Sequence, residues 1–143
     1  MTTKSSGFTL IELLVVVAIL GIISAVGVVA YNGYISGTQK KSAENMMQQI
    51  GLAETEEYSS YGSYWGNGDA CTETTTQEVG DSLFDSINYI DTDKIGYYFC
   101  VKAPGSTLSD PPYTVHAQSI KLDEDDNPVC NMTLDSSGTF TKC

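Results

Sequence analysis

The sequence contains no arginine, a single histidine and only seven lysines, against 18 acidic residues. Its formal net charge of −11 disfavours nucleic acid and anionic membrane surfaces as default partners, because both repel an acidic chain. The Gly-x-Ser-x-Gly and His-Glu-x-x-His signatures of hydrolases are absent, and so is a phosphate-binding glycine loop. We therefore expect a protein that is not an enzyme and that holds no cofactor or metal.

Three polar features remain that could carry chemistry. A general base needs an oriented partner, and nothing in the sequence supplies one for the lone histidine, so we expect His116 to be an ordinary strand residue. The acidic run Asp123–Asp126 is interpreted as a solvated turn before Pro128; calcium binding is the alternative, although the spacing of a calcium loop is lacking. Residues 131–133 match the N-glycosylation sequon, which is weak evidence by itself.

The most informative feature is a long apolar run near the start of the chain. Residues 8–30 exceed the ~20 residues that cross a hydrocarbon core of ~30 Å. One acid, Glu12, interrupts them, and an acid at the centre of a bilayer costs roughly 2.5 to 3.5 kcal/mol, less near an end. Such an acid usually has a partner or a function. No cleavage site of the ordinary secretory kind follows Ala30, so we expect the run to be retained.

The residues upstream suggest where the chain is cut. Residues 1–7 are short and polar, with one cation, Lys4. A cut between Gly7 and Phe8 would leave the apolar run with a free α-amine, which is cationic near neutral pH and suits the Glu12 carboxylate as a partner. We expect a leader at 1–7, a membrane-spanning or filament-core helix at 8–34 and a globular head at 35–143.

The run Gly-Phe-Thr-Leu-Ile-Glu-Leu-Leu, residues 7–14, resembles the prepilin signature, or class III signal sequence, of type IV pilins of the type IVa kind. The resemblance implies that a dedicated peptidase cuts after Gly7 and methylates Phe8. It also implies that Glu12 neutralises the N-terminal amine of a neighbouring subunit during filament assembly. The clear similarity covers residues 7–34, and the chain departs from many pilins in having no proline near residues 28–30.

Beyond the apolar run, the helix is predicted to continue to about Tyr61. Apolar residues recur there at three- and four-residue spacing and form one stripe that should pack on a sheet: Ala43, Met46, Met47, Ile50 and Ala53. Three nearby acids, Glu54, Glu56 and Glu57, fall off this stripe.

The rest of the chain predicts a small antiparallel sheet. A surface loop at 63–77 and a short helix at 79–87 precede the strands. Period-two alternation predicts strands at 95–102 and 113–122, and a hairpin of 129–134 with 139–142 turns at 135–138, where Gly138 can take a positive φ. The expected fold is α+β, a long N-terminal helix packed on this sheet, as in the pilin fold, with a disulfide-closed C-terminal region.

Four cysteines, all in the expected head, suit two disulfides in an oxidising compartment. Three pairings are possible. We favour Cys71 with Cys100 and Cys130 with Cys143, because each pair links neighbouring elements and the second closes a short C-terminal loop. Free thiols or a metal site are the alternatives, but no Cys-x-x-Cys or His-Cys spacing appears.

The sequence therefore predicts a structural subunit of a type IV pilus, with the inner membrane holding the precursor and an extracellular filament as the final location. Its expected partners are other copies of itself, the prepilin peptidase and the assembly machinery. Three alternatives stay open: a pseudopilin of a type II secretion system, a minor pilin of a DNA-uptake apparatus, and a membrane-anchored binding module that never polymerises. Glu12 within the apolar run argues against the last.

Overall fold

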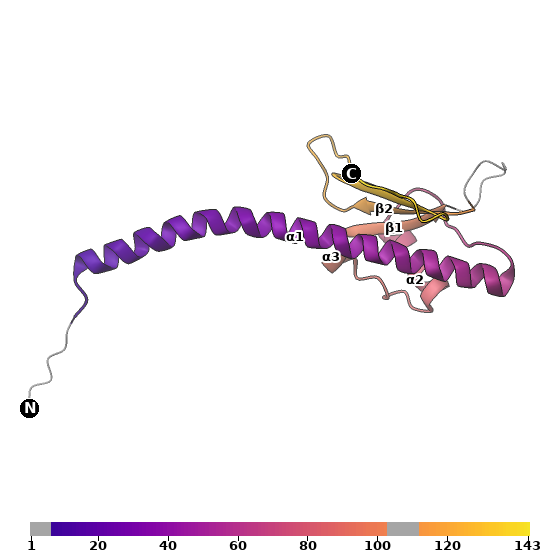
Figure 1. The fold of residues 1–143 in the computed structure, drawn as a ribbon, viewed down its shortest axis with the longest axis horizontal. Helices are drawn as coiled ribbons and strands as arrows, with labels where there is room; N and C mark the ends of the chain where they lie inside the picture. The colour runs from indigo at the N-terminus through magenta and orange to yellow at the C-terminus, as the bar shows by residue number, and fades with distance from the viewer. Residues whose placement is uncertain (1–6, 103–111) are drawn as a thin grey trace, which may run out of the picture. The chain divides into compact units, whose positions relative to one another are not determined.

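The computed structural model describes residues 7–102 and 112–143 of the chain. These residues divide into two compact units, one up to Thr38 and one from Gln39 to Cys143. A single helix, α1 (Leu10–Tyr61), supplies all of the regular structure of the first unit and continues into the second (Figure 1). The predicted long N-terminal helix is confirmed, and it begins two residues later than predicted.

The second unit is a small α+β head. Its elements after α1 are α2 (Glu73–Phe84), α3 (Thr92–Ile95), β1 (Tyr97–Lys102), β2 (Thr114–Ser119), β3 (Asn131–Asp135) and β4 (Phe140–Thr141). The strands form one antiparallel sheet in the order β1-β2-β3-β4, so each strand pairs with its neighbour in sequence. This arrangement confirms the predicted fold class.

One hydrophobic core joins the head part of α1 to the sheet. Burial alternates along β2 and β3 with the period of two that a one-sided sheet requires. The inward side chains meet those of α1 and α2, and the largest that are fully buried and apolar are Phe99, Met47, Ile50, Met132, Val79, Val101 and Val115. The prediction of an apolar stripe on α1 is correct in part. Ala43, Met47 and Ile50 are buried, whereas Met46 and Ala53 are only partly buried.

The outer edge of β1 is covered by side chains rather than by another strand. The hydroxyl of Thr76 on α2 accepts the Phe99 amide at 2.8 Å, and the Asn67 side-chain oxygen accepts the Val101 amide at 3.1 Å. The Asn67 amide in turn donates to the Val101 carbonyl at 2.9 Å. These bonds satisfy backbone groups that an open edge would offer to another chain.

The structure corrects the boundaries of α2. This helix begins at Glu73, not at residue 79, so the preceding loop is shorter than predicted. A capping box starts it: the Thr72 hydroxyl accepts the Thr75 amide, and the Thr75 hydroxyl accepts the Thr72 amide. Because the first turn carries threonines instead of an apolar stripe, periodicity missed it. The helix ends at Phe84, where Asp85 takes a left-handed conformation with φ 53°.

The strand boundaries also differ from the prediction. Ile95 belongs to α3, and Gly96, with φ 74°, turns the chain before β1 begins at Tyr97. The other strands are shorter than predicted, although the hairpin turn between β3 and β4 does place Gly138 at φ 83°. The acidic run Asp123–Asp126 is fully exposed, and the Asp123 carboxylate accepts the amides of Asp125 and Asn127, both at 2.9 Å, as a turn residue does.

Gly80 on α2 packs too closely against the following turn to accept a side chain. A Cβ atom at this position would lie 2.5 Å from the Ser86 carbonyl oxygen. We expect Gly80→Ala to lower the free energy of unfolding by about 1 to 3 kcal/mol, as overpacking does, despite the better helix propensity of alanine. Urea unfolding of the full chain in detergent measures this change.

Gly37→Ala is the matched control, because Gly37 also lies inside a helix but a Cβ atom there meets nothing within 4 Å. This variant should be unchanged or slightly more stable. Equal stability of Gly80→Ala and the unsubstituted chain would mean that the α2 turn adjusts freely.

Candidate functional site

The predicted cleavage site lies in exposed, non-helical chain just before α1. Gly7, Phe8 and Thr9 precede the first helical residue, and all three are exposed. The Thr9 carbonyl accepts the Leu13 amide at 3.2 Å, so Thr9 is the residue that caps the helix. The peptide bond between Gly7 and Phe8 therefore takes no part in the hydrogen bonding of α1.

The Glu12 carboxylate bonds to the cap residue of its own helix. Its Oε2 atom accepts hydrogen bonds from the Thr9 amide at 2.9 Å and from the Thr9 hydroxyl at 2.7 Å. In return, the Glu12 amide donates to the Thr9 hydroxyl oxygen at 3.3 Å. This is a reciprocal capping box of the Thr-x-x-Glu type. It was missed from the sequence, although Thr-x-x-Glu before an apolar run is its known signal. Glu12 thus has a hydrogen-bonding partner within its own chain.

The first half of α1 exposes an extensive apolar surface. Every residue from Gly7 to Tyr34 is exposed, and the side chains of Phe8 and Val16 are 84% and 47% accessible. By length and composition α1 is able to cross a membrane. Exposed apolar surfaces of this extent mark sites of interaction with a membrane or with another protein. Gly21, Ser24 and Ala25 are small enough to let a second helix approach closely.

Both disulfides lie in the head. Cys71 is bonded to Cys100 and Cys130 to Cys143, with Cα–Cα distances of 5.0 and 5.3 Å, which is the pairing favoured from the sequence. All four cysteines are used, so neither free thiols nor a thiolate metal site occurs in this structure.

Polar contacts reinforce the C-terminal disulfide. The Lys40 ammonium donates to the Cys143 carbonyl at 2.7 Å, and Lys142 pairs with Glu44 at 3.0 Å. Hydrogen bonds from Lys41 and then Lys142 hold the pKa of the nearly buried Glu44 below its usual value. The last residues of the chain are therefore tied to α1 by charges as well as to Cys130 by a covalent bond.

His116 lies on β2 opposite Cys100 and Thr133 and is half-buried. Its Nε2 atom is buried without a hydrogen-bond partner among the residues that the structure describes, and burial lowers its pKa. A general base needs a partner that orients it, and within the described chain nothing bonds to Nε2. His116 has the environment of an ordinary strand residue.

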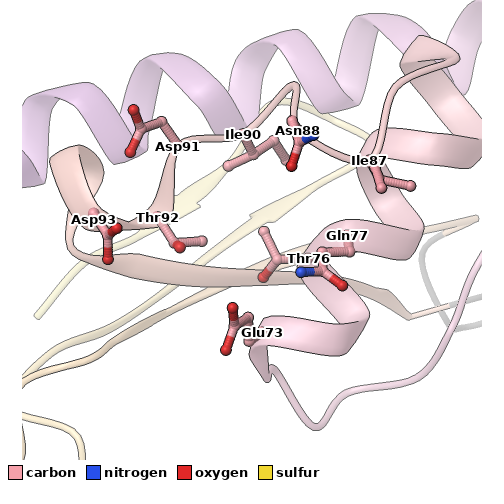
Figure 2. Close-up of a pocket in the computed structure, with 9 residues that line it drawn as sticks. All are labelled: Glu73, Thr76, Gln77, Ile87, Asn88, Ile90, Asp91, Thr92 and Asp93. Atoms are coloured by element: carbon pink, nitrogen blue, oxygen red, sulfur yellow. The ribbon is translucent and has the colours of Figure 1, made fainter.

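A cavity of about 290 Å³ in the head also lacks a catalytic arrangement. It lies between α2 and the segment that leads into α3, and its lining includes the carboxylates of Glu73, Asp91 and Asp93. Figure 2 shows that these three side chains do not converge on one point. Asp91 caps α3 through the Lys94 amide at 3.1 Å and pairs with the Lys94 ammonium at 2.6 Å.

Comparison with known proteins places the strongest similarity at the N-terminus. Residues 2–28 match the model of the prokaryotic N-terminal methylation motif. A fimbrial protein of Neisseria meningitidis serogroup B is 36% identical over 87 residues, which are 61% of this chain and 51% of that protein. The chain therefore spans about half the length of this relative.

Two further relatives match over shorter segments. A type IV major pilin protein of Neisseria gonorrhoeae is 41% identical over 64 residues, 45% of this chain and 39% of that protein. A type IV major fimbrial protein of Dichelobacter nodosus is 56% identical over 39 residues, 27% and 24% respectively. No solved structure matches the chain at a significant level. These findings confirm the resemblance to type IV pilins that residues 7–14 indicated.

The C-terminal disulfide has a testable effect on stability. Replacing both Cys130 and Cys143 by serine opens a loop with a sequence separation of 13, and for such a loop the chain-entropy model gives a loss of about 3 kcal/mol. We expect β3 and β4 to exchange amide hydrogens faster while α1 keeps its helical circular dichroism. Hydrogen exchange followed by mass spectrometry measures the first effect.

Lys40 and Lys142 tie the C-terminal residues to α1 by polar contacts. Lys142→Ala serves as the comparison, because it removes one of these contacts and leaves the disulfide in place. This variant removes one partly buried ion pair but leaves Glu44 paired with Lys41, so it should cost about 1 kcal/mol, less than the loss of the disulfide. Unchanged exchange in β3 and β4 of the double serine variant would show that the polar contacts alone hold the C-terminus.

Proposed function

We propose that this chain is a structural subunit of a type IV pilus, cut after Gly7 and polymerised through α1 into an extracellular filament. The observation that carries the proposal is the exposed apolar surface of α1 between Phe8 and Tyr34, interrupted by the single acid Glu12. The head has its own hydrophobic core, so its folding does not require this exposed apolar surface. The N-terminal methylation motif and relatives named as fimbrial protein and type IV major pilin support the same conclusion.

Processing would act on the exposed chain before the helix. A peptidase needs access to an extended peptide bond, and the bond between Gly7 and Phe8 lies outside α1 with both residues exposed. Cleavage there would make Phe8 the first residue and the site of N-methylation. Residues 1–7 would be removed as the leader, residues 8–34 would form the membrane and filament-core helix, and residues 35–143 would form the head.

Helix packing explains how one apolar surface serves two locations. In the inner membrane the surface faces lipid, which is as apolar as the side chains themselves, so burial alone does not favour leaving the bilayer. Close packing of helices through Gly21 and Ala25 adds van der Waals contact that lipid does not match. We infer that the precursor stays in the inner membrane and that assembly machinery moves it into the filament.

Glu12 would supply the specificity that apolar packing lacks. In the single chain its carboxylate is satisfied by Thr9. After cleavage, the Phe8 ammonium of a neighbouring copy would offer it a charged partner, and a charge-assisted bond is about twice as strong as a neutral one. An unpaired charge inside an apolar filament core is costly, so a subunit would fit only where its carboxylate meets that ammonium.

The alternatives gain no specific support. The relatives are named as fimbrial proteins and major pilins, which favours a pilus over a secretion pseudopilus. DNA uptake would favour a basic stripe, whereas the chain has no arginine, and Lys41 and Lys142 pair with Glu44. The head also lacks converging catalytic groups within its described residues, so we propose a non-enzymatic subunit.

Maturation gives the first test of the proposed function. Intact-mass analysis of filaments should find a chain that begins at Phe8, carries one additional methyl group and retains the apolar segment. Blocking the cut with Gly7→Leu should leave the unprocessed mass in the membrane and no filaments. A mature chain that begins after Ala30 would contradict the proposal.

The second test concerns Glu12. We expect Glu12→Ala to be processed and inserted normally, because the change removes a polar group from an apolar segment and costs the helix only its capping bonds to Thr9, about 1 kcal/mol. Filament assembly should fail or slow sharply, since each subunit would bring an ammonium without its carboxylate, and such an unpaired buried charge costs roughly 3 to 5 kcal/mol. Electron microscopy of filaments, with membrane levels of processed subunit as the reference, measures the effect.

Glu56→Ala is the matched control, because Glu56 is an exposed acid on the head part of the same helix and should not affect filament number. Thr9→Val tests the two partners of Glu12 separately. It removes the Thr9 hydroxyl, which bonds to Glu12 within the chain, and leaves the proposed contact with the amine of the neighbouring subunit. Normal filaments from Glu12→Ala would show that Glu12 is only a helix-capping residue.

A further inference from the structure

Glu54 is a buried acid in the head that the proposed function does not use. It falls off the stripe drawn from the sequence, yet its side chain is fully buried. The buried positions of α1 follow the spacing Ala43, Met47, Ile50 and Glu54, so the helix turns Glu54 rather than Ala53 inward. The sequence-based expectation for this residue was therefore wrong.

The Glu54 carboxyl group is only half satisfied. Its Oε2 atom accepts the backbone amide of Trp65 at 3.0 Å. Its Oε1 atom is buried without a hydrogen-bond partner in residues 7–102 and 112–143. No lysine or histidine of these residues forms an ion pair with it.

The titratable groups that face Glu54 give its charge no support. Glu57 lies one turn away on α1 and carries a like charge, while burial raises the pKa of Tyr113, so its hydroxyl is neutral at the pH values that concern Glu54. Burial raises the pKa of Glu54 to about 7, with the Trp65 amide opposing this rise and Glu57 adding to it. Near neutral pH both protonation states are therefore populated.

The contact with Trp65 fastens the chain that follows α1 back onto the helix. In the same region the ring of Tyr64 stacks on Tyr58 at 4.5 Å between centroids and lies 5.1 Å from the ring of Tyr113. The Tyr113 hydroxyl donates to the Gly51 carbonyl at 3.0 Å, which holds Tyr113 against α1. Asn67 and Gly68 are bonded to the Val101 carbonyl of β1. Residues 62–66 are therefore the part of this segment that depends on the aromatic stack, on packing against the core and on the bond between Trp65 and Glu54.

We propose that Glu54 is a proton-dependent latch, which fastens residues 62–66 to α1 while its carboxyl group is neutral and releases them when it ionises. An ionised carboxylate without a partner is stable only in contact with water. Residues 62–66 are the part of the chain around Glu54 that can move, because α1 is held by Met47 and Ile50 in the core and residues 67–68 are bonded to β1. The latch lies wholly within residues 39–143.

The direction of the pH dependence follows from the raised pKa. The latched state binds the proton more tightly than the released state, in which Glu54 has a value near 4.5. The latch is therefore at full strength below pH 4.5. The ratio of latched to released chains falls about tenfold per pH unit between pH 4.5 and about pH 7, and at higher pH it stays constant.

The single tryptophan makes the latch measurable in the full chain in detergent micelles. Hydrogen exchange of peptides that cover residues 62–66, corrected for the intrinsic exchange rate, should show protection that falls about tenfold per pH unit between pH 5 and 7. Quenching of Trp65 fluorescence by acrylamide should rise over the same range; excitation at a wavelength that tyrosine does not absorb confines this signal to the one tryptophan.

Two variants isolate the carboxyl group. Glu54→Gln keeps an acceptor for the Trp65 amide but cannot ionise, so protection of residues 62–66 should no longer depend on pH. Glu57→Gln removes the neighbouring like charge, so the dependence should persist and end at a lower pH. If Glu54→Gln does not fold, carbon NMR of the labelled Glu54 carboxyl in the unsubstituted chain gives its pKa directly.

A Glu54 midpoint below about 5.5, or protection in the unsubstituted chain that is flat between pH 5 and 7, would overturn the latch. The same holds if Glu54→Gln keeps the full pH dependence. These outcomes leave the proposed function untouched, because that proposal rests on filament formation and on Glu12.

Discussion

The structure depends on one helix that must satisfy two different surroundings. From Gly7 to Tyr34 every residue of the chain is exposed, whereas from Ala43 onward α1 buries one face in the head. A helix can meet both demands because its backbone hydrogen bonds are internal, so no backbone group is left unsatisfied where water is excluded. The composition of each half fits its surroundings in the structure: the first half is apolar and exposed, and the second packs one face on the sheet.

The head is stabilised mostly at its ends, because its sheet is small. Side chains of Asn67 and Thr76 cover the free edge of β1, and the Cys130–Cys143 disulfide closes the other end of the fold. The two-residue β4 pairs through only two positions, so it would fray without that covalent bond. These ties add stability to a head that consists of residues 39–143 and therefore has only a small core, in keeping with the limited burial available to small domains.

The sequence predicted the elements better than their limits, and the reason is physical. Periodicity finds apolar faces, so it located α1, the strands and the hairpin turn at Gly138. Caps depend on single hydrogen bonds, which periodicity does not record, and therefore Thr72 and the Thr9–Glu12 pair were missed. Glu54 was misplaced because Ala53 and Glu54 both fit the helical spacing from Ile50, and hydrophobicity alone favoured the alanine.

Two carboxylates on α1 show how environment assigns different roles to the same chemical group. Glu12 and Glu54 lie on one helix, and each accepts a backbone amide. Glu12 also accepts a hydroxyl and remains exposed, so it can keep its charge and exchange one partner for another. Glu54 is enclosed with one oxygen unsatisfied, so its protonation state is coupled to whether the surrounding chain stays closed. We therefore propose recognition for Glu12, which can meet a partner, and proton-sensitive packing for Glu54, which has one oxygen without a partner.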